Sequence, residues 1–212
     1  MAGRVTRLLR SGKVTVDLKN REWKDSTPDT NSTPLHLIIG DSMASHLGLP
    51  NTLVIARGGL KTKDVPDLLH NKSHVIHPNN YHRCETVTLV VGTNDIDPRN
   101  PLQELDILEL LCEFNQLVMD LRNLFPNARL AIMNILPRST THPEGRMRID
   151  CFNSVMQERI ERKPHATWIK LFRELLTPKG DLNMTYYSRG CLHLSPQGTE
   201  MMKRSIMEFQ QF

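Results

Sequence analysis

The stretch "TVTLVVGTNDI", residues 86–96, is the part of the sequence that most directly predicts the fold. Its first six residues are all apolar or β-branched, a pattern typical of a strand whose two faces are both covered. Gly92, Asn94 and Asp95 follow directly, and this composition is typical of a turn. The stretch therefore predicts a buried strand with polar groups at its end.

Comparable apolar runs and helical patterns alternate along the chain. Further strands are expected at "LHLII" (35–39), "TLVIA" (52–56), "ARLAIMNIL" (128–136) and "TWIKLF" (167–172). Residues 102–125 and 146–162 have apolar side chains at helical spacing, and a last helix is expected from Pro196. This alternation predicts an α/β fold with a central parallel sheet covered by helices on both faces. Ligands of such folds bind at the carboxyl ends of the strands.

The first 34 residues differ from the rest in charge and composition. Residues 1–25 carry seven basic and three acidic side chains, and the remainder has 20 of each, so the whole net charge of +4 lies in this arm. "KDSTPDTNSTP" (24–34) reads as a linker, and "KVTVDL" (13–18) is a candidate strand that would need a partner. We expect a basic arm and linker over 1–34 and one domain over 35–212. The arm could bind nucleic-acid phosphates or serve only as a solubilising extension.

Several classes of protein are disfavoured by composition. No apolar run approaches the roughly 20 residues that span a bilayer, and the N-terminus has no signal-peptide core. Four scattered cysteines without a C-x-x-C pair argue against a zinc module and for a reducing, cytoplasmic location. The histidines at 70, 74, 77 and 82 lack accompanying ligands at suitable spacing, so no metal site is expected.

Polar residues follow three successive predicted strands. Ser42 follows the first in "IIGDS", Gly58 and Gly59 follow the second, and Asn94 follows the third. Singly, these residues are explained by a helix cap and by ordinary turns. Together with His193, which precedes the last helix, they provide a nucleophile, two oxyanion donors and a base.

The segments "IGDS", "GGLKTKD", "VVGTNDI" and "LHLSPQG" resemble, in order, the four signature blocks of the SGNH (GDSL-type) hydrolases over residues 35–212. The resemblance implies a three-layer α/β/α sandwich, as in flavodoxin-like folds, and a serine esterase mechanism without metal or organic cofactor. It implies Ser42 as nucleophile and His193 as base. Ser42, Gly59 and Asn94 would form the oxyanion hole. "NILPR" (134–138) is similar to a further loop motif of the family.

One block departs from the family pattern. Gly190 stands where the family has an aspartate three residues before the histidine. A main-chain carbonyl of 188–190 could orient His193, or Asp181 could substitute, or the site could be inactive. Cys191 is a weak hydrogen-bonding group and is better explained as a structural thiol.

The sequence thus predicts a cytoplasmic serine esterase for small acyl esters, including acetyl esters. SGNH-like domains also occur in the first open reading frame of LINE-type retrotransposons, beside nucleic-acid-binding segments, and the basic arm fits that origin. The alternative function is a weak or inactive module that binds RNA, as the SGNH-like domain of the insect protein Oskar does. The presence of Ser42, Asn94 and His193 favours the enzyme.

Overall fold

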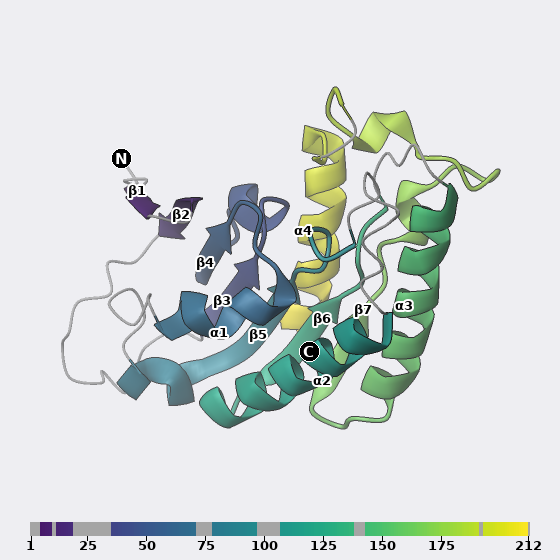
Figure 1. Ribbon diagram of the computed structural model, residues 1–212. Helices are drawn as coiled ribbons and strands as arrows, with labels where there is room; N and C mark the ends of the chain where they lie inside the picture. Colours follow the sequence, from purple (N-terminus) through teal and green to yellow (C-terminus); the bar gives the residue numbers. More distant parts are fainter. Residues whose placement is uncertain are drawn as a thin grey trace.

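The computed structural model describes residues 5–9, 12–18, 35–70, 78–96, 107–137, 143–190 and 193–211. Its centre is a seven-stranded sheet in the order β1-β2-β4-β3-β5-β6-β7 (Figure 1). The strands are β1 (Val5–Leu9), β2 (Gly12–Leu18), β3 (Leu35–Gly40), β4 (Thr52–Arg57), β5 (Cys84–Val90), β6 (Arg129–Met133) and β7 (Ala166–Ile169). The five strands from β4 to β7 in this order are all parallel, which confirms the predicted parallel sheet.

Helices cover both faces of the sheet, as predicted. They are α1 (Val65–His70), α2 (Ile107–Leu124), α3 (Pro143–Glu161) and α4 (Pro196–Gln210), with short 3₁₀ helices η1 (Ala44–His46), η2 (Thr62–Asp64), η3 (Pro78–Arg83), η4 (Arg173–Leu175) and η5 (Met184–Tyr186). One hydrophobic cluster joins the sheet to α1, α2 and α3, and a second joins it to η1 and α4. The result is a three-layer α/β/α sandwich (Figure 1).

The two clusters follow from the alternation of side chains along a strand. In β3, Leu37 and Ile39 belong to the α1–α3 side, whereas Ile38 between them belongs to the α4 side. All three are fully buried. A central parallel strand therefore favours apolar or β-branched residues on both faces, which explains the nearly continuous apolar runs in the sequence.

Element boundaries differ from the sequence predictions at several elements. The fifth apolar run was expected to stay extended to residue 172, but β7 ends at Ile169, and the chain enters η4 at Arg173. Helix α3 begins at Pro143, earlier than its apolar pattern, because proline suits the first turn of a helix. Residues 102–106 of the helix expected over 102–125 lie outside the described residues.

The candidate strand in the N-terminal segment is present as β2. It pairs antiparallel with β1 on one side and with β4 on the other, which supplies the partners that such a strand needs. The division of the chain at residue 34 stays a prediction.

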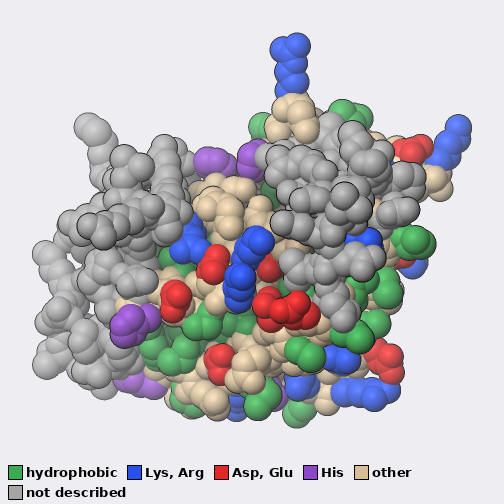
Figure 2. Space-filling view, viewed as in Figure 1, with side chains coloured by type: hydrophobic (Ala, Val, Ile, Leu, Met, Phe, Trp, Pro, Cys, Tyr) green, Lys and Arg blue, Asp and Glu red, His purple; other side chains and the backbone are tan. Residues whose placement is uncertain are grey.

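Charged side chains of both signs are interspersed on the face of the molecule that Figure 2 shows. Among the described residues visible there, lysine and arginine do not gather into one basic patch. No helix within the described ranges is long and apolar enough to cross a membrane.

Candidate active site

Ser42 and His193 are 151 positions apart in the sequence, but their side chains meet. Ser42 lies in the turn after β3, and His193 lies three residues before α4. The Ser42 Oγ atom is 3.2 Å from the His193 Nε2 atom, which is within hydrogen-bond distance. The structure therefore brings together the predicted nucleophile and the predicted base in the relation that proton transfer requires.

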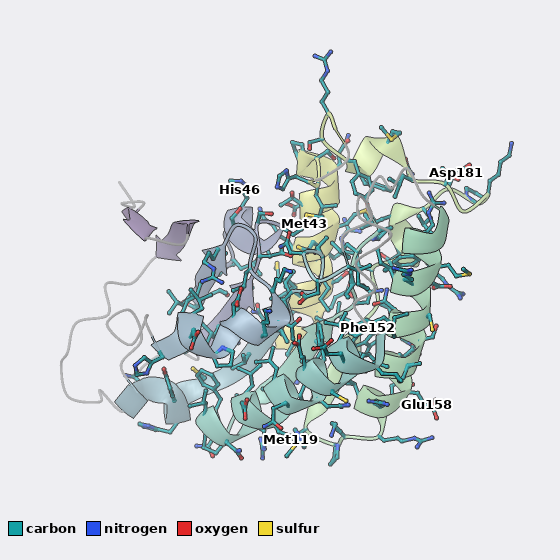
Figure 3. The ribbon with its side chains drawn as sticks, viewed as in Figure 1. Met43, His46, Met119, Phe152, Glu158 and Asp181 are labelled. Atoms are coloured by element: carbon teal, nitrogen blue, oxygen red, sulfur yellow. The ribbon has the colours of Figure 1, made fainter. Side chains whose placement is uncertain are left out.

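The Ser42 hydroxyl is not used as a helix cap, which was the alternative explanation for this serine. The cap residue of η1 is Met43, without a side-chain cap, and the Met43 N–H donates to Asp41 Oδ1 at 2.8 Å. Asp41 is fully buried, and Met43 lies next to η1 at the ends of the strands (Figure 3). Asp41 thus fixes the turn, which leaves the Ser42 side chain to face His193.

Asn94 links the loops that carry Ser42 and Gly59. Its Nδ2 donates to the Leu60 carbonyl at 3.1 Å and to Asp41 Oδ2 at 3.4 Å. Leu60 follows Gly59 in the chain, and Asp41 precedes Ser42. The 3.4 Å contact is near the outer limit for a hydrogen bond, so this hydrogen is the one available to a developing oxyanion.

The main-chain amides of Ser42 and Gly59 are also available as donors. Within the described part of the chain, neither N–H donates a hydrogen bond to another group. Gly59 has a φ of 71° and lies exposed after β4. A left-handed φ is unfavourable for residues with a Cβ atom, so this loop favours glycine.

Asp95 holds the second half of the Gly59 loop. Both of its carboxylate oxygens accept from the Thr62 N–H at 3.1 Å, and Oδ2 also accepts from Thr62 Oγ1 at 3.1 Å. Burial raises the pKa of Asp95 from 3.8 to about 6, although the Thr62 hydrogen bonds oppose the shift. An ion pair of 2.9 Å between Arg57 and Asp64 closes the same loop on the other side. The sequence suggested Asp95 only as part of a turn and gave no signal for Thr62.

The backbone of His193 is held by the segment before it. The His193 carbonyl accepts from the Ser188 N–H at 2.8 Å and from Ser188 Oγ at 3.0 Å. The Tyr187 hydroxyl donates to the Pro137 carbonyl, which anchors the segment to the chain after β6. Ser195 caps α4 by accepting from the Gly198 N–H at 3.2 Å. Sequence reasoning missed both residues: the Tyr187 bond spans 50 positions, whereas the Ser188 bonds close a local turn of five residues.

The orientation of the His193 ring is not explained by the residues that the sequence suggested. Among the described residues, Nδ1 is hydrogen-bonded neither to a carboxylate nor to a carbonyl of 188–190. Asp181 lies near the first turn of α3, where its Oδ1 is 4.0 Å from Arg146 Nη1 (Figure 3). Cys191 lies outside the described residues. Gly190 has a φ of 100°, a conformation that an aspartate rarely adopts.

The remaining titratable groups form no second catalytic centre in the described ranges. No cluster of three or more potential metal ligands is found there. His70 and His82 are exposed, and residues 74 and 77 lie outside the described residues. Burial raises the pKa of the Cys84 thiol to about 12, which makes it unreactive.

Comparison with known proteins identifies the class. The family model described as GDSL-like Lipase/Acylhydrolase family matches residues 24–201, so the chain belongs to this family of hydrolases. No curated protein gives a significant match.

Solved structures of low sequence identity share the fold. A GDSL-like lipase from Bacteroides thetaiotaomicron is 12% identical with a TM-score of 0.65, over 82% of this chain and 86% of that one. A catalytic mutant of an acetylxylan esterase from Geobacillus stearothermophilus is 15% identical with a TM-score of 0.61, over 84% and 94%. The C-terminal catalytic domain of a peptidoglycan O-acetyltransferase from Streptococcus pneumoniae is 16% identical with a TM-score of 0.60, over 84% and 92%.

Proposed function

We propose that the protein is a serine esterase that hydrolyses small acyl esters, with Ser42 as nucleophile and His193 as general base. The observation that carries the proposal is the 3.2 Å contact between Ser42 Oγ and His193 Nε2. The acetylxylan esterase and the peptidoglycan O-acetyltransferase, whose structures are similar to this one, support an acetyl group as the acyl group of the substrate.

The reaction begins when Ser42 Oγ attacks the ester carbonyl carbon and His193 Nε2 takes the hydroxyl proton. The carbonyl oxygen becomes an oxyanion, which accepts from the Ser42 and Gly59 N–H groups and from Asn94 Nδ2. His193 then gives its proton to the leaving alcohol as the C–O bond breaks. Water attacks the acyl-enzyme with His193 again as base, which releases the acid and restores Ser42.

Within the described ranges, no carboxylate accepts from His193 Nδ1, so the third member of a triad is not found there. The carboxylate of a triad fixes the tautomer of the histidine and stabilises its charged form. Ser188 fixes only the backbone of His193, so the proposed enzyme works as a Ser–His dyad with a slower chemical step.

The test is labelling by a fluorophosphonate together with hydrolysis of 4-nitrophenyl acetate. We expect the wild type to be labelled at Ser42, and Ser42→Ala and His193→Ala to lose at least about 99% of the activity, a loss of the size that removal of a nucleophile or base produces. Ser45→Ala is the matched control, because Ser45 lies in η1, three residues after Ser42, and among the described residues its Oγ donates only to the Ser42 carbonyl. Equal rates for wild type and Ser42→Ala would reject the proposal.

A second function, nucleic-acid binding by residues 1–25, is favoured by one observation, the concentration of the entire net charge of +4 in that segment. The proposed origin in a LINE-type retrotransposon rests on the same observation. On the face that Figure 2 shows, the described residues form no basic patch that would bind nucleic acid.

A further inference from the structure

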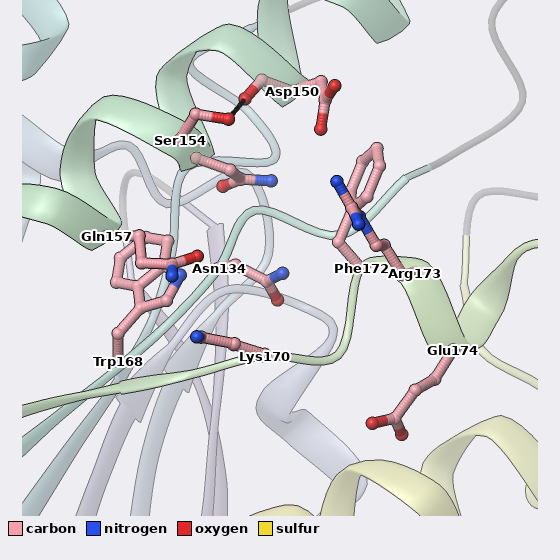
Figure 4. Close-up of a pocket in the computed structure, with 10 residues that line it drawn as sticks. Asn134, Asp150, Ser154, Gln157, Trp168, Lys170, Phe172, Arg173 and Glu174 are labelled. Atoms are coloured by element: carbon pink, nitrogen blue, oxygen red, sulfur yellow. Dashed lines mark hydrogen bonds between the residues drawn. The ribbon is translucent and has the colours of Figure 1, made fainter.

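A cavity separate from the Ser42–His193 site lies at the same edge of the sheet as Ser42 but at different strands. Its volume is about 320 Å³, and it lies between α3 and the chain that follows β6 and β7 (Figure 4). β6 is two strands from β3, which places it roughly 10 Å across the sheet. None of Ser42, Gly59, Asn94 and His193 lines the cavity. The residues that line it include Asn134, Asp150, Ser154, Gln157, Trp168 and Lys170.

Asn134 presents an unused donor to this cavity. Its Oδ1 accepts from the Leu171 N–H at 3.1 Å, which fixes which end of the amide faces the backbone. The Nδ2 group therefore points the other way, and no acceptor for it is found among the described residues. Asn134 is only 7% exposed. The Nδ2 group opens into the cavity, where it can donate to water or to an acceptor oxygen of a ligand.

Acceptors stand opposite this donor on α3. Gln157 Nε2 donates to Glu161 Oε1 at 2.9 Å, which leaves its Oε1 free to accept. The exposed carboxylate of Asp150 stands at the rim, one helical turn from Ser154 (Figure 4). The cavity thus offers both a donor and acceptors. This combination suits a hydroxyl group, which both donates and accepts hydrogen bonds.

The charges around the cavity cancel. Lys170 and Arg173 are matched by Asp150 and Glu174. Lys170 Nζ is also held by Glu161 Oε1 at 3.1 Å. An anion would meet as many carboxylates as cations, so a neutral ligand fits better.

The remaining wall is aromatic. Trp168 and Phe172 line the cavity and are each 6% exposed. The volume is near the lower end of the range of about 300–1,000 Å³ for small-molecule sites. It would hold roughly ten water molecules at about 30 Å³ each. We propose that this cavity is a binding site for a neutral, hydroxyl-rich ring of monosaccharide size, independent of the reaction at Ser42.

The experiment uses Trp168 as the reporter. The chain has two tryptophans, Trp23 and Trp168, so the full-length Trp23→Phe variant reports on the cavity alone. D-glucose is titrated to about 100 mM, above the millimolar Kd expected of a ligand with so few atoms. Inorganic phosphate serves as the anionic probe. We expect a saturable change in fluorescence with glucose and none with phosphate.

A matched pair of substitutions on α3 tests the location. Ser154→Phe places a large side chain in the cavity, whereas Glu158→Phe makes the same change at an exposed position outside it (Figure 3). We expect glucose affinity to fall at least about tenfold in Ser154→Phe, because the phenylalanine ring would occupy the space of the ligand. In Glu158→Phe the affinity should stay unchanged. Asn134→Ala should weaken binding by about three- to tenfold through loss of one donor. Its melting temperature is measured alongside, and Gln157→Ala replaces it as the test if Asn134→Ala unfolds.

Three results would overturn the proposal. They are no saturable response to glucose, equal affinity in Ser154→Phe and Glu158→Phe, and phosphate binding that is tighter than glucose binding and blocked by Ser154→Phe. Ser42→Ala should bind glucose as the wild type does. Loss of esterase activity with intact glucose binding would therefore contradict the proposed function and leave this site standing.

Discussion

Asp95 makes the stability of the protein depend on pH in a direction that can be calculated. Its pKa rises from 3.8 to about 6 because the carboxyl is buried, so the folded protein favours the protonated form. The stabilisation by protonated Asp95 is complete below pH 3.8 and is lost as the pH rises through 6. A shift of about two units corresponds to about 3 kcal/mol.

The perturbation is Asp95→Asn, which resembles the protonated acid at every pH. We expect Asp95→Asn and wild type to have similar free energies of unfolding near pH 3.5 and the variant to be more stable by about 3 kcal/mol at pH 8. For a chain of this length the difference at pH 8 corresponds to a rise in Tm of about 6–12 °C. Urea unfolding at both pH values measures it, and taking the difference between the proteins cancels the other titrating groups.

The same change should reduce catalysis. The Asp95 carboxylate accepts hydrogen bonds from both donors of Thr62, its N–H and its hydroxyl. Hydrogen bonds to a charged acceptor are stronger than hydrogen bonds to an amide. A looser Gly59 loop should lower kcat for 4-nitrophenyl acetate by about tenfold, or 1.4 kcal/mol. Thr62→Val, which removes only the hydroxyl bond, should raise the pKa of Asp95 further. If the stability difference between Asp95→Asn and wild type were the same at pH 3.5 and pH 8, the burial argument would be refuted.

Three further predictions concern the His193 segment and the arm. Gly190→Asp should lose about 1–3 kcal/mol of stability and part of the activity, because φ at this position is 100°. Gly190→Ala controls for that strain, and a kcat of Gly190→Asp above wild type would mean that the added carboxylate orients His193. Tyr187→Phe should lower stability by about 1 kcal/mol in urea unfolding and also lower kcat, because its bond to the Pro137 carbonyl anchors this segment. A change in stability with kcat unaltered would contradict the anchoring role. Replacing the seven basic residues of 1–25 by glutamine, which keeps β1 and β2 in the chain, should weaken RNA binding and flatten its salt dependence by up to about one unit of log–log slope per lost phosphate contact. Unchanged binding would place the surface on the domain.

The sequence by itself determined the class of fold. Apolar runs such as residues 35–39 and 86–91 can be stable only where both faces of a strand are covered, and helical patterns between them leave few arrangements besides a parallel sheet with two helical layers. The side chains at the strand ends were then expected at one edge, and the Ser42–His193 contact agrees with this.

The tertiary structure decided what holds these groups in place. Asp95 meets Thr62 across 33 positions, and Tyr187 meets Pro137 across 50, so neither pair leaves a periodic signal in the sequence. The sequence showed only that Gly190 replaces the family's aspartate. The structure adds that φ at this position is 100°, a conformation that disfavours aspartate. The direction of the Asn134 amide also depends on the tertiary structure, because the Leu171 N–H donates to Oδ1 and so turns Nδ2 toward the cavity. Local propensity and hydrophobic periodicity act over a few residues, but burial and hydrogen-bond partners depend on which distant segments the fold places together.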